Sequence, residues 1–172
     1  MSSHESERPL WEPGAERVAK ANLTAFIAYV RDKATSGSAG VADYASLYRW
    51  SVESPELFWP ALWGFCDVIA TPWQKVVIGL DRMAPPDPDL GPRWFDGARL
   101  NFAENLLRYD DERVAIVAWN ERGRQRQLTY AELQSVVART AEALRSHGIR
   151  PGDRVAGFMP NIPESVIAML AT

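Results

Sequence analysis

The side chains of this sequence that could act as nucleophiles, bases or metal ligands are few and widely spaced. The single cysteine, Cys66, lies in an aromatic and aliphatic stretch, which favours an inert buried thiol over a nucleophile. His4 lies in the polar N-terminal tail, and His147 lies where a helix is predicted to end. There His147 is favoured as a charge on the helix dipole over a base or a ligand. One cysteine and two distant histidines cannot form a zinc site of the usual spacing.

The charged clusters allow two interpretations each. Asp110 to Glu112 could be paired catalytic carboxylates, but three acids before a strand favour a solvated loop. Arg122, Arg124 and Arg126 could contact a phosphate, while the favoured alternative is a charged hairpin edge that discourages sheet association. The sequence has no GxxxxGK[ST] loop and no GxGxxG turn after a strand, and Ser36 to Gly40 is typical of a linker. We therefore predict no catalytic, cofactor-binding or metal-binding residue in this chain.

Composition indicates a soluble globular protein. The 172 residues are 47% hydrophobic and 24% charged, with a net charge of -3. This charge gives no reason to expect a nucleic acid or an anionic membrane as partner. No apolar stretch approaches the roughly 20 residues of a membrane span, and Met1 to Pro9 lacks the features of a secretory signal. Because a single cysteine allows no internal disulfide, we expect a cytoplasmic protein. We also expect residues 1–8 to be disordered.

The N-terminal half of the chain, which must position some of these side chains, is predicted to be helical and rich in aromatic residues. Helices are predicted from Glu16 to Lys33, from Asp43 to Arg49, and after the N-cap sequence Ser54-Pro55-Glu56. The third helix has large apolar residues on more than one face, which predicts burial on several sides. Six of the seven tryptophans precede residue 95, and packing is favoured over a ligand platform because no pattern of interleaved basic residues suggests base stacking. Met83 to Asp89 is predicted to be a stiff, proline-rich connector.

The second half predicts alternating strands and helices. In chain order, we expect a helix at Asn101–Arg108, a strand at Val114–Trp119, a return strand at Gln125–Leu128, a helix capped by Thr129 and ending at His147-Gly148, a strand at Val155–Met159, and a helix opened by Pro160 to Glu164. In the two apolar strands, Val114–Trp119 and Val155–Met159, polar and apolar residues do not alternate. Such continuous apolar runs are typical of parallel strands covered on both faces. The last helix reaches Thr172 with no capping residue, so we expect a truncated chain.

The predicted fold class is α/β. It consists of a helical, aromatic-rich segment followed by the first βαβα units of an incomplete domain, with parallel strands and a right-handed crossover. Such a sheet needs more strands than this chain supplies.

Several segments together resemble the acetoacetyl-CoA synthetases, a branch of the adenylate-forming acyl-CoA synthetases. The segments are Pro9–Pro13, Asn22–Phe26, Tyr44–Val52 with Phe58-Trp59, Trp94–Leu107, Leu128–Leu133, Gly152–Val155, Met159–Glu164 and Ala168–Thr172. The strongest is Trp94–Leu107, and the similarity runs from about Pro9 to Thr172. The resemblance implies an N-terminal segment at 1–94 and the truncated start of the AMP-binding domain at 95–172.

The resemblance also implies a two-step ligase reaction of a carboxylic acid, ATP and CoA. The acid forms an acyl-adenylate with loss of pyrophosphate, Mg²⁺ neutralises phosphate charge, and the CoA thiol displaces AMP. The family's phosphate loop and catalytic lysine lie downstream, so no catalytic or ligand residue is transferred to this chain, which alone is expected to be inactive. What transfers is scaffold: Asn101 and Thr129 as helix caps, and Pro160 and Pro163 as a corner. Acetyl- or propionyl-CoA synthetases, or a non-catalytic interaction module, are the alternatives.

Overall fold

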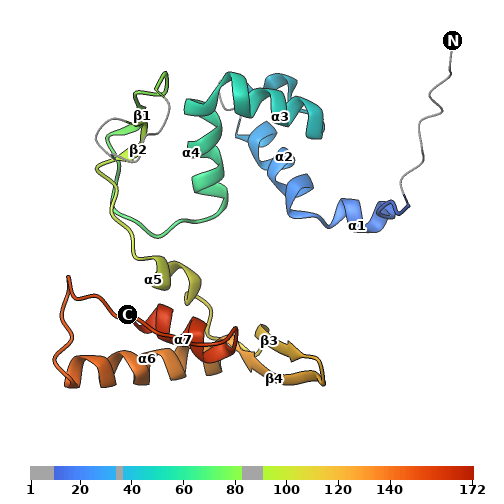
Figure 1. Ribbon diagram of the computed structural model, residues 1–172. Coiled ribbons are helices and arrows are strands. Elements are labelled where there is room, and N and C mark those ends of the chain that lie inside the picture. The colour runs from blue at the N-terminus through green and yellow to red at the C-terminus, as the bar shows by residue number, and fades with distance from the viewer. Residues whose placement is uncertain (1–9, 34–36, 83–90) are drawn as a thin grey trace, which may run out of the picture. The chain divides into compact units, whose positions relative to one another are not determined.

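Residues 10–33, 37–82 and 91–172 are described by the computed structural model, and the chain divides into two compact units (Figure 1). Unit 1 comprises Met1–Val68 and Trp73–Gly97, and unit 2 comprises Ile69–Pro72 and Ala98–Thr172. The expected disorder of residues 1–8 and the predicted connector Met83–Asp89 lie outside the described residues. Within the described part, no helix is long and apolar enough to cross a bilayer.

Unit 1 is built mainly from short helices. Its elements are α1 (Ala15–Ala19), α2 (Asn22–Asp32), the 3-10 helix η1 (Ser38–Gly40), α3 (Tyr44–Glu53), α4 (Pro55–Phe65), β1 (Lys75–Ile78) and β2 (Arg93–Asp96). The single helix predicted for Glu16 to Lys33 is therefore two helices. The break arises because the Val18 carbonyl accepts from the Ala21 N–H at 3.1 Å and the Thr24 hydroxyl at 2.6 Å.

Local capping chemistry sets the starts of α3 and α4. Asp43 and Ser46 form a reciprocal capping box, and hydrogen bonds from Ser46 hold the pKa of the Asp43 carboxyl below its usual value. Helix α4 begins at Pro55, as predicted, although the Ser54 side chain makes no cap hydrogen bond. The prediction that α4 is buried on several sides holds only in part: the helix has neighbours on more than one side, but none of its residues is fully buried and Trp59 is 40% exposed. A second face of α4 contacts the β1–β2 pair, since the ring of Trp59 lies 5.7 Å from that of Trp94 and the ring of Trp63 lies 4.2 Å from that of Phe95, centroid to centroid.

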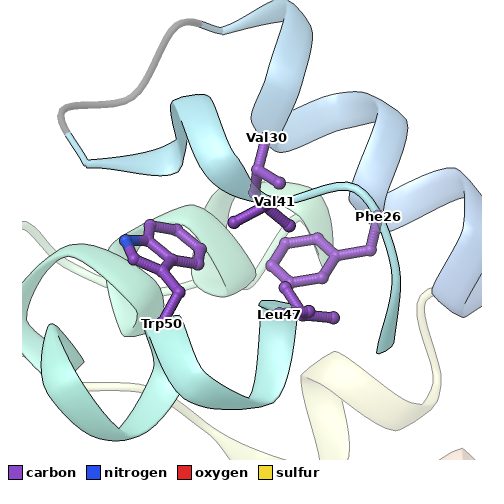
Figure 2. Packing of buried hydrophobic residues seen from close by; sticks show 5 residues of the cluster. All are labelled: Phe26, Val30, Val41, Leu47 and Trp50. Atoms are coloured by element: carbon purple, nitrogen blue, oxygen red, sulfur yellow. The ribbon is translucent and has the colours of Figure 1, made fainter. Parts of the chain in front are cut away.

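The core of unit 1 joins three helices. Phe26 and Val30 of α2 meet Val41, which follows η1, and Leu47 and Trp50 of α3 (Figure 2). Partly buried side chains of α4, among them Phe58 and Phe65, pack against this cluster. The aromatic residues of this cluster thus serve packing.

Strands β1 and β2 form an antiparallel pair that the sequence pattern did not predict. Lys75 lies opposite Asp96 and Val77 opposite Trp94. The two strands are separated by the predicted connector, so no short turn marks them as a hairpin.

Unit 2 combines a hairpin with helices. Its elements are α5 (Phe102–Leu106), β3 (Val114–Asn120), β4 (Gly123–Thr129), α6 (Tyr130–Ser146) and α7 (Pro163–Ala171). Strands β3 and β4 pair antiparallel, and α7 packs on α6 (Figure 1). The predicted capping box of Thr129 and Glu132 is present, and His147 and Gly148 end α6. The core consists of Leu128, Leu133, Val137, Ile167 and Leu170.

The structure has no strand at Val155–Met159. Residues 153–160 are described but belong to no helix or strand, and Phe158 is fully exposed. Both sheets of the described chain are two-stranded and antiparallel. A strand requires a hydrogen-bonding neighbour, and none lies beside this segment. The mixed helix and sheet content agrees with the predicted α/β class, whereas the parallel βαβα unit stays a prediction for a longer chain.

Candidate functional site

The side chains with catalytic potential do not come together in the described residues. Among the residues that the structure describes, no three histidine, cysteine, aspartate or glutamate side chains are grouped to hold a metal. The predicted burial of Cys66 is wrong, because α4 ends at Phe65 and the thiol is exposed at the helix end. His147 also lies at a helix end, with its Nδ1 2.8 Å from the Ala143 carbonyl. Its position agrees with the structural interpretation of this residue.

The three hairpin arginines have structural contacts in unit 2. Arg126 donates from β4 to Glu164 of α7 at 2.7 Å, and Arg124 donates to Gln127 at 3.2 Å. The backbone N–H of Arg122 donates to Asn120 in the turn. These contacts fit the charged hairpin edge better than a phosphate site. Since the Arg126–Glu164 pair is about half exposed, it adds little stability.

Asp111, the middle acid of the 110–112 cluster, also has a structural partner. Its carboxylate accepts from Arg113 Nε at 2.9 Å and Nη2 at 2.8 Å, and these hydrogen bonds hold the pKa of Asp111 below its ordinary value. The Arg113 guanidinium in turn lies over the ring of Tyr109, 4.4 Å from its centroid, and near that of Tyr130. Asp111 is thus a partner of this aromatic and cationic cluster, which fits a structural role better than a catalytic carboxylate pair.

The segment Trp94–Leu107 has unusual backbone geometry. Phe95 has a φ of 48°, which is rare for a bulky residue and marks local strain. Its ring packs 4.2 Å from Trp63 and 5.8 Å from Trp73, centroid to centroid, and these contacts hold the strained residue in place. Further along, Asn101 caps α5, because its Oδ1 accepts from the Glu104 N–H at 3.0 Å. The cap was predicted; the strain at Phe95 has no signal in the sequence.

Two family matches overlap on this segment. Residues 44–106 match the family described as acetyl-coenzyme A synthetase N-terminus, and residues 102–172 match the AMP-binding enzyme family. An acetoacetyl-coenzyme A synthetase from Rhizobium meliloti is 40% identical over 98% of this chain and 24% of its own length. The chain is similar to acetoacetyl-CoA synthetases over nearly all of its length.

Other relatives show the same similarity. The acetoacetyl-CoA synthetase of Gallus gallus is 36% identical over 94% of the chain and 23% of its own length. A solved acetoacetyl-CoA synthetase from Streptomyces lividans superposes with a TM-score of 0.76 at 39% identity, covering 95% of this chain and 25% of the solved one. The chain thus spans about a quarter of the length of the relatives it matches, and it is similar to their N-terminal portion.

The overlap of the two family matches, residues 102–106, is helix α5. The candidate functional element is therefore the segment around α5, where the N-terminal family region passes into the AMP-binding region. Its polar side chains cap and pair with backbone groups. This arrangement positions chain segments relative to α5.

Replacing Asn101 by alanine removes the cap of α5, so we expect the free energy of unfolding to fall by about 1 kcal/mol. Asn101→Asp keeps an acceptor for the Glu104 N–H and should retain most of that stability. In a complete synthetase, the Asn101→Ala variant should have a lower melting temperature and nearly unchanged Michaelis constants for ATP and acid. A large fall in turnover with unaltered stability would instead place the segment in the active site.

Proposed function

We propose that the complete protein is an acid–thiol ligase that makes acetoacetyl-CoA from acetoacetate, ATP and CoA. The single observation that carries the proposal is the 40% identity to an acetoacetyl-coenzyme A synthetase across 98% of this chain. An alternative acid is suggested by a malonamoyl-CoA synthetase from Penicillium aethiopicum, which is 33% identical over 96% of the chain. Acetate and propionate are further alternatives.

The reaction proceeds in two steps, adenylation of the acid and transfer of the acyl group to CoA. A carboxylate oxygen attacks the α-phosphorus of ATP, the bond to the β-phosphate breaks, and pyrophosphate leaves with its electron pair. The CoA sulfur then attacks the acyl carbon of the mixed anhydride, loses its proton, and AMP leaves. The described residues offer no grouped ligands for Mg²⁺, so we assign none of them to the metal and take no step through it. We likewise assign no catalytic, ATP-binding or CoA-binding residue to this chain.

The role of this chain is that of a scaffold. We infer an N-terminal segment at 1–94 and the beginning of the AMP-binding domain at 95–172, and a cytoplasmic location for the whole protein. In the complete domain, Val155–Met159 forms a strand that joins β3, α6 and α7 in the first βαβα units. Exposed apolar residues on both segments support this proposal: Val114, Val117, Trp119, Val155, Phe158 and Met159.

Pyrophosphate exchange and thioester formation with a panel of acids test the proposed activity. The complete protein should use acetoacetate in preference to acetate, propionate and malonamate, and should release AMP with each thioester. The 172-residue chain, as the matched control, should give no exchange above background. A preference for another acid would correct the substrate, whereas exchange by the purified chain would show that an ATP site lies within these residues.

A further inference from the structure

Residues 69–72 belong to unit 2, although the chain on both sides of them belongs to unit 1. This short segment has little apolar burial to hold it, since Ile69 is 39% exposed and Thr71 is exposed. Segments held by polar contacts and not by burial are the ones that open locally in folded proteins. The hydrogen bonds of the segment therefore decide where it lies.

Asn105 holds the first residue of this segment through a two-way pair. The Ile69 N–H donates to Asn105 Oδ1 at 2.9 Å, and Asn105 Nδ2 donates back to the Ile69 carbonyl at 2.9 Å. Two residues of neighbouring antiparallel strands exchange hydrogen bonds in the same way, so the side-chain amide takes the place of a peptide group. Nδ2 also donates to the carbonyl of Asn101 at 3.0 Å, which fixes the orientation of the amide on α5.

A second two-way pair holds the other end of the segment. The Thr71 N–H donates to the Arg99 carbonyl at 2.8 Å, and the Arg99 N–H donates to the Thr71 hydroxyl at 2.8 Å. Neither bond involves Asn105. Both pairs nevertheless bind one four-residue segment.

We propose that residues 69–72 form a strap, and that Asn105 latches this strap to α5 in a closed state that opens as one unit. When the strap is closed, the chain passes between the units three times, after Val68, Pro72 and Gly97. When it is open, residues 69–72 leave unit 2 and the chain passes only once. The latch thus decides whether residues 69–72 are held in unit 2, and the Asn105 side chain controls it.

Amide hydrogen exchange on the 172-residue chain tests the coupling directly. In Asn105→Ala, the protection of the Thr71 and Arg99 amides should fall about tenfold or more, although neither amide bonds to Asn105. The Glu132 amide of α6 should keep its protection and so shows that unit 2 stays folded. Unchanged protection at Thr71 and Arg99 would overturn the proposal, because the strap would then not open as one unit.

Asn105→Asp separates the latch from any general effect on α5. The ionised carboxylate can still accept from the Ile69 N–H but cannot donate to the two carbonyls, so the strap should open at about pH 7. At about pH 4 and below, protonation of the introduced carboxylate restores a donor. The protection of the Thr71 and Arg99 amides should then return toward the protection measured in the unaltered chain at the same pH. The charged neighbours are Glu104 and Arg108 on the same turn, the latter donating to the Asn105 carbonyl at 3.1 Å, and Arg99 of the strap pair.

Asn120 provides the matched control. Its Oδ1 accepts from the Arg122 N–H at 2.8 Å in the β3–β4 turn of the same unit. Asn120→Asp should leave the Thr71 and Arg99 amides unchanged at both pH values. Acid recovery in Asn105→Asp, absent from Asn120→Asp, supports the latch; loss of protection with no acid recovery would mean that Asn105 only stabilises α5, and would overturn it.

Discussion

Replacing Phe26 by alanine should lower the free energy of unfolding of unit 1 by about 3–5 kcal/mol. Phe26 is 4% exposed, and its ring lies against Val41 and Leu47 in the centre of the cluster (Figure 2). The ring also packs edge-on to Phe58 at 5.8 Å and tilted to Phe65 at 5.1 Å, centroid to centroid. Truncation therefore removes both buried area and aromatic pairs. Since small domains are stable by only about 5–15 kcal/mol, the loss is a large fraction of the total.

Tryptophan fluorescence during urea unfolding measures this loss. Six of the seven tryptophans belong to unit 1 and only Trp119 to unit 2, so the signal reports mainly on unit 1. Tyr48→Ala is the matched control, because Tyr48 lies on α3 but is 60% exposed and should cost less than about 0.5 kcal/mol. The buried clusters of the two units share no residue, so exchange protection within α6 should not change in Phe26→Ala. Equal losses in both variants would show that Phe26 is not at the centre of a core.

Local chemistry made the helix starts predictable. Asp43, Asn101 and Thr129 each lie next to the first residue of a helix, and each accepts a backbone hydrogen bond three residues along. Capping needs only neighbouring residues, so the sequence contains all of the signal. The hairpin was predictable for the same reason, because the polar residues Glu121 and Arg122 form the turn between β3 and β4.

Features that depend on distant partners were not predictable. The exposure of Cys66 depends on what packs beside the end of α4, and the pairing of Val77 with Trp94 joins segments with no turn signal between them. Asn105 is the clearest example for the candidate site. Its neighbours show an asparagine near the end of a short helix, whereas its partner, Ile69, is 36 residues away. No periodicity or cap rule could have identified this pair.

The apolar segment at Val155–Met159 has the composition of a strand but does not form one in the described chain. Its composition is that of a buried strand, but a strand is stabilised by its neighbours in the sheet, and the described chain places none beside it. Its large exposed apolar side chains should bind an apolar dye and favour self-association and a broad melt of the isolated chain. The same segment should be buried in the complete domain that we propose.

Phe158→Asp should therefore affect the stability of the 172-residue chain and of the complete protein very differently. In the 172-residue chain Phe158 is 109% exposed, so the change should alter the free energy of unfolding by less than about 0.5 kcal/mol and reduce dye binding. In the complete protein the same carboxylate would enter the interior of a sheet, at a cost above about 4 kcal/mol. Leu10→Asp is the control within the chain, since Leu10 is 108% exposed but lies in no predicted strand. If the complete protein melts at the same temperature with and without Phe158→Asp, the segment stays outside the sheet and the βαβα assignment is wrong.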